Sequence, residues 1–108
     1  MDTPLKQKAQ FRLGQIVYHS KFRYRGVIVD ADPYFQGTDE WYEHVARSRP
    51  PKDKPWYHVL VNEAVHATYV AEQNLEPADK PQKIVHPLTN SLLTEFDGER
   101  YKLRRQTH

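Results

Sequence analysis

Residues 25–33 read RGVIVDADP, and this stretch is the clearest strand signal in the chain. Its three consecutive β-branched residues pack well on a pleated surface, and the lack of polar alternation predicts that both faces of the strand are covered. Pro33 cannot donate a ladder hydrogen bond, so we expect the strand to end at Asp32. Gly26 within the pattern indicates a bulge or a close approach of another backbone.

Four further strands are expected around this one. They cover residues 15–19, 56–61, 65–70 and 83–87. The first of them lies close enough to residue 25 to form an antiparallel hairpin, and a turn of 3₁₀ helix is expected within residues 71–77. Five short strands with tight turns predict a mainly β fold, as a small antiparallel β-barrel of the SH3-like or OB type.

Residues 38–47 predict one short helical insert. Thr38 suits the N-cap, and two acidic residues follow it in the first turn, where the helix dipole favours negative charge. Trp41 and Val45 are four residues apart and share one face. A helix of about ten residues is not stable alone, so we expect Trp41 to dock on the sheet.

One domain is expected in 108 residues. The divisions are a flexible N-terminal tail over 1–10, the barrel over 11–87 and a C-terminal extension over 88–108. Within the extension, Asp97 and Gly98 indicate a two-residue hairpin turn. The alternative is a tail that becomes ordered only against a partner.

The composition excludes several classes of site. There is no cysteine, which rules out disulfides, thiolate metal sites and cysteine nucleophiles. Residues 1–10 have no apolar core and are not expected to be a signal peptide. No run approaches the roughly 18 to 20 apolar residues of a membrane span. We therefore expect a cytoplasmic protein without a membrane partner.

Charge is distributed unevenly along the chain. The net charge is +2, but residues 1–25 carry +5, residues 26–99 carry −7 and residues 100–108 carry +4. Basic ends that converged in space would present a patch to nucleic acid, whereas separate basic ends would only be solvated. The sequence leaves both alternatives open.

Catalytic and metal-binding constellations are weak. The six histidines lack the spacing of a zinc protease motif, and no glycine-rich phosphate loop is present. Asp30 and Asp32 alternate on one strand, so they suit either an acid–base pair or the backbone-capping role common at strand ends; we favour the second. We expect no enzyme, no metal site and no cofactor.

The segment HSKFRYR, residues 19–25, interleaves cations with aromatic rings. Lysine and arginine neutralise phosphates, and aromatic and guanidinium planes stack on bases. The alternative is a solvated hairpin loop anchored by its aromatic residues. The candidate nucleic-acid-binding residues are Lys21, Arg23, Tyr24, Arg25, Arg104 and Arg105.

Trp41 and Tyr42 are candidates for a protein interface, with burial in the core as their alternative.

Four segments in order carry a resemblance to a known family. They are GQIVYHS at 14–20, YRGVIVDADP at 24–33, PWYHVLV at 55–61 and YVAEQNL at 69–75. Together they resemble the YccV-like, hemimethylated-DNA-binding domain family over about residues 11–87, a family whose bacterial members include heat-shock proteins.

The resemblance implies a small SH3-like antiparallel β-barrel in a cytoplasmic, non-catalytic stress protein that forms a homo-oligomer, with a trimer as the implied assembly. It also implies two roles. One is binding of hemimethylated DNA, in control of a replication initiator. The other is an adaptor role, promoting degradation of certain denatured proteins by an ATP-dependent, Lon-type protease. We place the adaptor role slightly ahead, because the acidic middle of the chain suits protein partners better than phosphate. The same domain type occurs in some eukaryotic F-box proteins.

Overall fold

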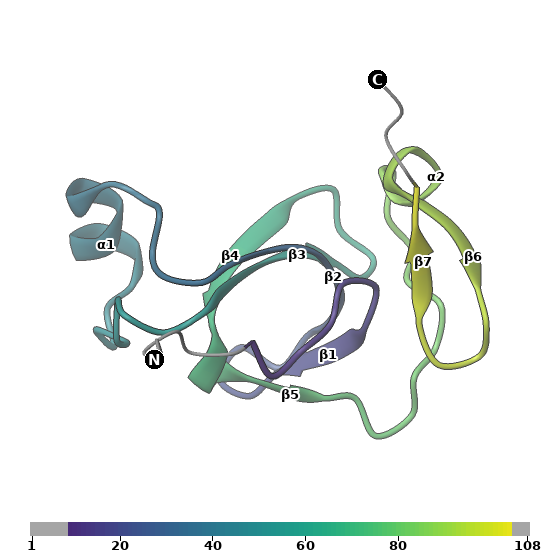
Figure 1. The fold of residues 1–108 in the computed structure, drawn as a ribbon, viewed down its shortest axis with the longest axis horizontal. Coiled ribbons are helices and arrows are strands. Elements are labelled where there is room, and N and C mark those ends of the chain that lie inside the picture. The colour runs from purple at the N-terminus through teal and green to yellow at the C-terminus, as the bar shows by residue number, and fades with distance from the viewer. Residues whose placement is uncertain (1–8, 105–108) are drawn as a thin grey trace, which may run out of the picture.

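Five strands form one antiparallel sheet in the order β4-β3-β2-β1-β5 (Figure 1). A computed structural model describes residues 9–104. Its strands are β1 (Ile16–His19), β2 (Arg25–Asp32), β3 (Trp56–Val61), β4 (Ala67–Ala71), β5 (Leu75–Pro77), β6 (Leu93–Phe96) and β7 (Tyr101–Leu103). Its helices are α1 (Asp39–Val45), the 3₁₀ turn η1 (Glu72–Asn74) and α2 (Thr89–Leu92). The predicted mainly β class is confirmed, whereas no pairing of β4 with β5 closes the sheet within the described residues.

The predicted strand over residues 25–32 lies at the centre of the sheet as β2, between β1 and β3. Val27 and Ile28 are fully buried on opposite faces, as the unbroken apolar run predicted. Gly26 has the expected close approach, because a Cβ there would lie 2.6 Å from the Leu60 carbonyl oxygen. The register shift comes later in the strand, between Ile28 and Asp30.

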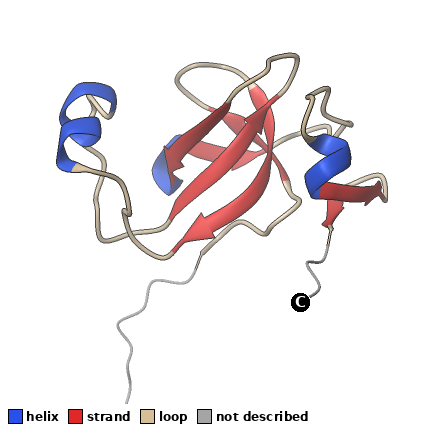
Figure 2. Cartoon of the chain, turned by 90° about the horizontal axis from the view of Figure 1, so that it is seen from above, coloured by secondary structure: helices blue, strands red, loops and turns tan. Residues whose placement is uncertain are grey.

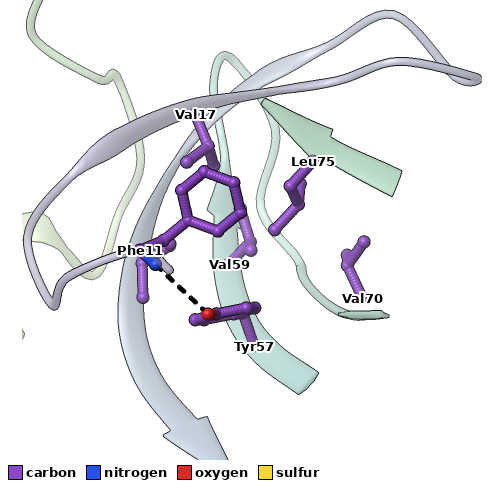
Figure 3. Packing of buried hydrophobic residues seen from close by; sticks show 7 residues of the cluster. Phe11, Val17, Tyr57, Val59, Val70 and Leu75 are labelled. Carbon is purple, nitrogen blue, oxygen red and sulfur yellow. Dashed lines mark hydrogen bonds between the residues drawn. The ribbon is translucent and has the colours of Figure 1, made fainter. Parts of the chain in front are cut away.

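Two apolar clusters cover the two faces of the sheet. The first contains Phe11, Val17, Ile28, Tyr57, Val59, Val70 and Leu75 (Figure 3). Phe11 fixes the entering chain to this cluster, because its N–H donates to the Tyr57 hydroxyl at 3.2 Å. The second contains Ile16, Val27, Leu60, Ile84, Leu93 and Tyr101. Successive strand residues point to opposite faces, so β1, β2 and β3 supply both clusters.

The predicted helical insert is confirmed as α1. The Thr38 hydroxyl accepts the Trp41 N–H at 3.0 Å, which is the expected N-cap bond. Trp41 packs against Trp56 and Tyr69, with ring centroids 6.0 and 5.7 Å apart. The helix therefore stands at one end of the sheet, held there by an aromatic cluster (Figure 2).

The fifth strand differs from the prediction. It is β5, which pairs with β1, and residues 83–87 are not a strand. In that segment the Ile84 N–H donates to the Tyr101 hydroxyl at 2.9 Å and the Val85 N–H to Asn62 Oδ1 at 2.8 Å. Side chains thus satisfy the backbone donors that a sheet ladder would otherwise need.

The C-terminal extension forms a β6–β7 hairpin, so the alternative of a tail ordered only by a partner is wrong for residues 88–104. The turn is displaced from the predicted Asp97 and Gly98, because Phe96 pairs with Tyr101 and the Asp97 N–H donates to the Arg100 carbonyl at 3.0 Å. Asp97 Oδ1 also accepts the N–H groups of Glu99 and Arg100, both at 2.9 Å. The Tyr101 N–H donates to the Gly14 carbonyl at 2.8 Å, which joins the hairpin to the sheet. Within residues 9–104, no helix has the length and apolar character needed to cross a membrane.

Candidate nucleic-acid interface

A buried histidine organises the loop between β1 and β2. His19 is 4% exposed, and its Nδ1 accepts the N–H groups of Lys21 at 3.1 Å and Phe22 at 3.0 Å. The Phe22 ring stacks on His19 with centroids 4.7 Å apart, yet Phe22 remains 75% exposed. The loop is closed by Arg23, whose φ of 60° makes the turn. His19 therefore fixes the backbone of this loop and the position of the Phe22 ring, while Lys21 and Arg23 remain exposed.

The state of His19 makes this loop sensitive to pH. Burial lowers the pKa of His19 below its ordinary value, and the nearby Lys21 charge lowers the pKa further. As pH falls below about 6.5, the unfolded chain takes up the proton first, so folding stability should decrease. We expect the urea midpoint to fall between pH 7.5 and 5.5, and the fall to be smaller in His19→Asn. Equal pH slopes in the two proteins would contradict this account.

A groove of about 650 Å³ lies between this loop, β4 and α1. Its aromatic and basic lining residues are His19, Lys21, Phe22, Tyr24, Trp41, Arg47, Trp56, His58 and Tyr69. The Tyr24 hydroxyl is 2.6 Å from Thr68 Oγ1, so the loop is joined to β4 across the floor of the groove. Tyr24 and Thr68 are both half-buried, and Lys21, Phe22 and Arg47 are exposed.

Three of the candidate residues line this one groove. They are Lys21, Tyr24 and Trp41. Lys21 and Tyr24 were predicted to bind nucleic acid, and Trp41 was predicted to lie at a protein interface. Arg23 is exposed on the same loop but does not line the groove. Tyr42, expected at a protein interface, is instead 8% exposed, and its hydroxyl donates to the Pro50 carbonyl at 2.7 Å. It is a core residue of the α1 docking cluster.

The remaining candidates lie elsewhere. Arg25 donates to the Gln82 carbonyl at 3.0 Å, so its guanidinium holds the segment after β5. Arg104 donates to the Asn90 carbonyl at 2.8 Å, in the hairpin at the opposite end of the molecule from α1 (Figure 1). Arg105 lies outside the described residues. In the described part of the chain, the N-terminal basic segment reaches the groove through Lys21, and the C-terminal basic segment does not line it.

Six of the aromatic and basic groove residues were not among the candidates from the sequence: His19, Phe22, Arg47, Trp56, His58 and Tyr69. Arg47 follows α1, and Tyr69 comes from β4, where it pairs with His58. The Tyr69 hydroxyl donates to Asp32 Oδ2 at 2.6 Å, and burial, together with this bond, raises the pKa of Tyr69. The phenol therefore stays protonated and fixes the ring at the groove wall. Only the strand register, which follows from the β3–β4 hairpin, would have indicated this position.

The residues best able to hold a cation are Asp30, Asp32 and His58. Their possible ligand atoms lie within 4.8 Å of one another, although no metal site was expected. Asp32 is already engaged by Tyr69, and His58 Nε2 lies 3.2 Å from Asp32 Oδ2. Asp30 Oδ1 accepts the Ala31 N–H at 2.9 Å. This is a local bond to the backbone, the role that the sequence favoured for Asp30 and Asp32 over acid–base catalysis.

Comparison with known proteins gives one family and a set of longer relatives. A family model described as "Hemimethylated DNA-binding protein YccV like" matches residues 9–100. F-box only protein 21 of Homo sapiens and of Pongo abelii are each 32% identical to the chain over 93 residues, and that of Mus musculus is 31% identical. Each match covers 84% of this chain but only 15% of the relative. The chain thus corresponds to a small part of those proteins.

Proposed function

Because the chain belongs to the YccV-like family of hemimethylated DNA-binding proteins, we propose that it is a non-catalytic module that binds DNA and prefers the hemimethylated duplex. The observation that carries the proposal is the groove beside the β1–β2 loop. It combines exposed cations with aromatic rings, the two kinds of side chain that neutralise phosphates and contact bases.

The charges at the groove support DNA as its partner, although the middle of the chain is acidic. Residues 26–99 carry a net charge of −7, yet among the residues lining the groove no carboxylate is found and the fixed charges are Lys21 and Arg47. The lining of the groove is therefore basic although the middle of the chain is acidic, so a phosphate at the groove meets cations and no lining carboxylate. The N-terminal basic segment contributes Lys21 to this contact, and the C-terminal basic segment is not needed for it.

The finer features of the family are also proposed here. A 3₁₀ turn before β5, and the return of β5 to the edge beside β1, support an SH3-like barrel. Leu93 and Tyr101 pack on the sheet, which supports a domain that includes the C-terminal hairpin rather than ending at residue 87. A homo-oligomer, with a trimer as its assembly, and a cytoplasmic location remain expectations.

DNA binding is tested by fluorescence anisotropy with unmethylated, hemimethylated and fully methylated duplexes over a salt series. We expect the hemimethylated duplex to bind most tightly, and affinity for all three to fall as salt rises. Lys21→Ala should weaken all three complexes and reduce the slope of log affinity against log salt by about 0.9.

The matched control is Lys102→Ala, which removes an exposed lysine from β7 at the other end of the molecule. Its salt slope should equal that of the unmodified chain. Equal losses in both variants would mean that the Lys21 loop is not the contact surface.

A second candidate is the adaptor role, in which the chain presents denatured proteins to an ATP-dependent, Lon-type protease. Its support is β4, which among residues 9–104 pairs only with β3 and borders the groove. An extended client segment could add to such an edge as a further strand. Addition of the chain should then accelerate client degradation by the protease, and naked DNA should not alter the rate; an unchanged rate would argue against the role.

A further inference from the structure

We propose that the groove between the β1–β2 loop, β4 and α1 receives one base that is unstacked from the bound DNA. This inference rests on the proposed function, since it names what part of DNA enters that site. It predicts that recognition requires a nucleotide to leave the duplex, and does not consist of phosphate contacts alone.

The walls of the groove offer stacking surfaces. Tyr69, Trp41 and Trp56 all contact one another, with the Tyr69 ring centroid 5.7 Å from that of Trp41 and 5.2 Å from that of Trp56. Trp41 and Tyr69 are half-buried and offer the stacking surface, whereas Trp56 is buried. Phe22 stands at the rim on the opposite element and is 75% exposed, although it stacks on His19 beneath it. Bases unstacked from a duplex are held between aromatic and apolar side chains of this kind.

The charges match a nucleotide better than an apolar peptide. Lys21 comes from the β1–β2 loop and Arg47 from the segment after α1, so cations border the groove from two elements. Neither forms an ion pair with another residue of the described range. The nearby Asp32 is bonded to Tyr69 and is not among the lining residues. An unstacked base carries phosphates on both sides, which two such cations can neutralise.

The edge of β4 supplies polar groups for the base. The Glu72 N–H donates to the Pro55 carbonyl and the Val61 N–H to the His66 carbonyl. Since hydrogen-bonding direction alternates along a strand, the backbone groups of Ala67 and Tyr69 point away from β3. Among the described residues β4 pairs only with β3, so the outward groups of Ala67 and Tyr69 have no strand partner, and both residues line the groove. Free N–H and C=O groups next to stacking rings are what a base edge requires.

The inference is tested with hemimethylated duplexes that carry an abasic site opposite each base in turn. Removing the pairing partner removes part of the energy needed to unstack the target base, so at one position the affinity should rise about tenfold. Phe22→Ala should abolish this rise. Tyr34→Ala removes an exposed aromatic ring outside the groove and should preserve the rise. Urea unfolding confirms that both variants are folded.

The outcomes separate this inference from the function on which it rests. DNA binding with no preferred abasic position, or with a rise that survives in Phe22→Ala, overturns base insertion and leaves the DNA-binding function intact. Absence of DNA binding overturns both. If Phe22→Ala instead changes client degradation, or the molar mass measured by light scattering, the groove holds a peptide or a second copy and the inference is wrong.

Discussion

Gly14→Ala is expected to lower the free energy of unfolding by about 3 kcal/mol, the larger part of it from a collision between backbones. Gly14 has a φ of +87°, which disfavours any residue with a side chain. A Cβ there would lie 1.9 Å from the Tyr101 carbonyl oxygen. The hairpin cannot retreat without breaking the bond between the Tyr101 N–H and the Gly14 carbonyl.

Gly98→Ala is the matched control for this substitution. Gly98 has a φ of +101°, but a Cβ at this position would have no atom within 4 Å, so its replacement should cost about 1 kcal/mol through the backbone alone. Urea unfolding measures both losses, and hydrogen exchange should show faster exchange over residues 93–103 in Gly14→Ala. Equal losses would mean that the contact with Tyr101 does not hold the hairpin on the sheet.

Trp56→Ala is expected to lower the free energy of unfolding by about 3 to 5 kcal/mol. Trp56 is 1% exposed, and its Nε1–H donates to the Pro51 carbonyl at 3.0 Å. Its ring also contacts Phe35, Trp41 and Tyr69, so its loss removes the surface on which α1 docks. DNA affinity should fall together with stability, because the groove loses its α1 wall.

Trp56→Phe distinguishes packing from hydrogen bonding at this position. It retains an aromatic ring and loses the Nε1–H, so we expect a loss of about 1 to 2 kcal/mol and a groove that still binds DNA. Thermal and urea unfolding give the stabilities, and the anisotropy assay gives the affinities. A loss in Trp56→Phe as large as that in Trp56→Ala would indicate that the aromatic cluster is not what positions α1.

The elements that sequence analysis predicted correctly are those with local causes. β2 follows from consecutive β-branched residues, and α1 follows from its Thr38 cap. The fifth strand was misplaced because Leu75–Pro77 has only three residues, whereas residues 83–87 have the stronger apolar pattern. β5 forms because β1 offers a free edge beside it, which no local pattern shows.

The kinds of residue that line the groove could be predicted from the sequence, but the directions in which their side chains point could not. The alternation of cations and rings identified Lys21 and Tyr24, both of which line it. The same alternation included Arg25, whose guanidinium instead bonds a backbone carbonyl. Trp41 was predicted to dock on the sheet and does so, and it also lines the groove that the sequence assigned to a different partner. Side-chain direction at a strand end depends on tertiary contacts.

The position of the two tryptophans gives the chain its own optical reporter. The sequence contains only Trp41 and Trp56, their rings are 6.0 Å apart, and both line the groove. Intrinsic emission from tryptophan therefore arises entirely beside the proposed base site. A stacked base should quench it, whereas undocking of α1 should shift it to longer wavelength by wetting the indoles. Ligand entry and loss of the helix can thus be followed separately, in real time and without a label.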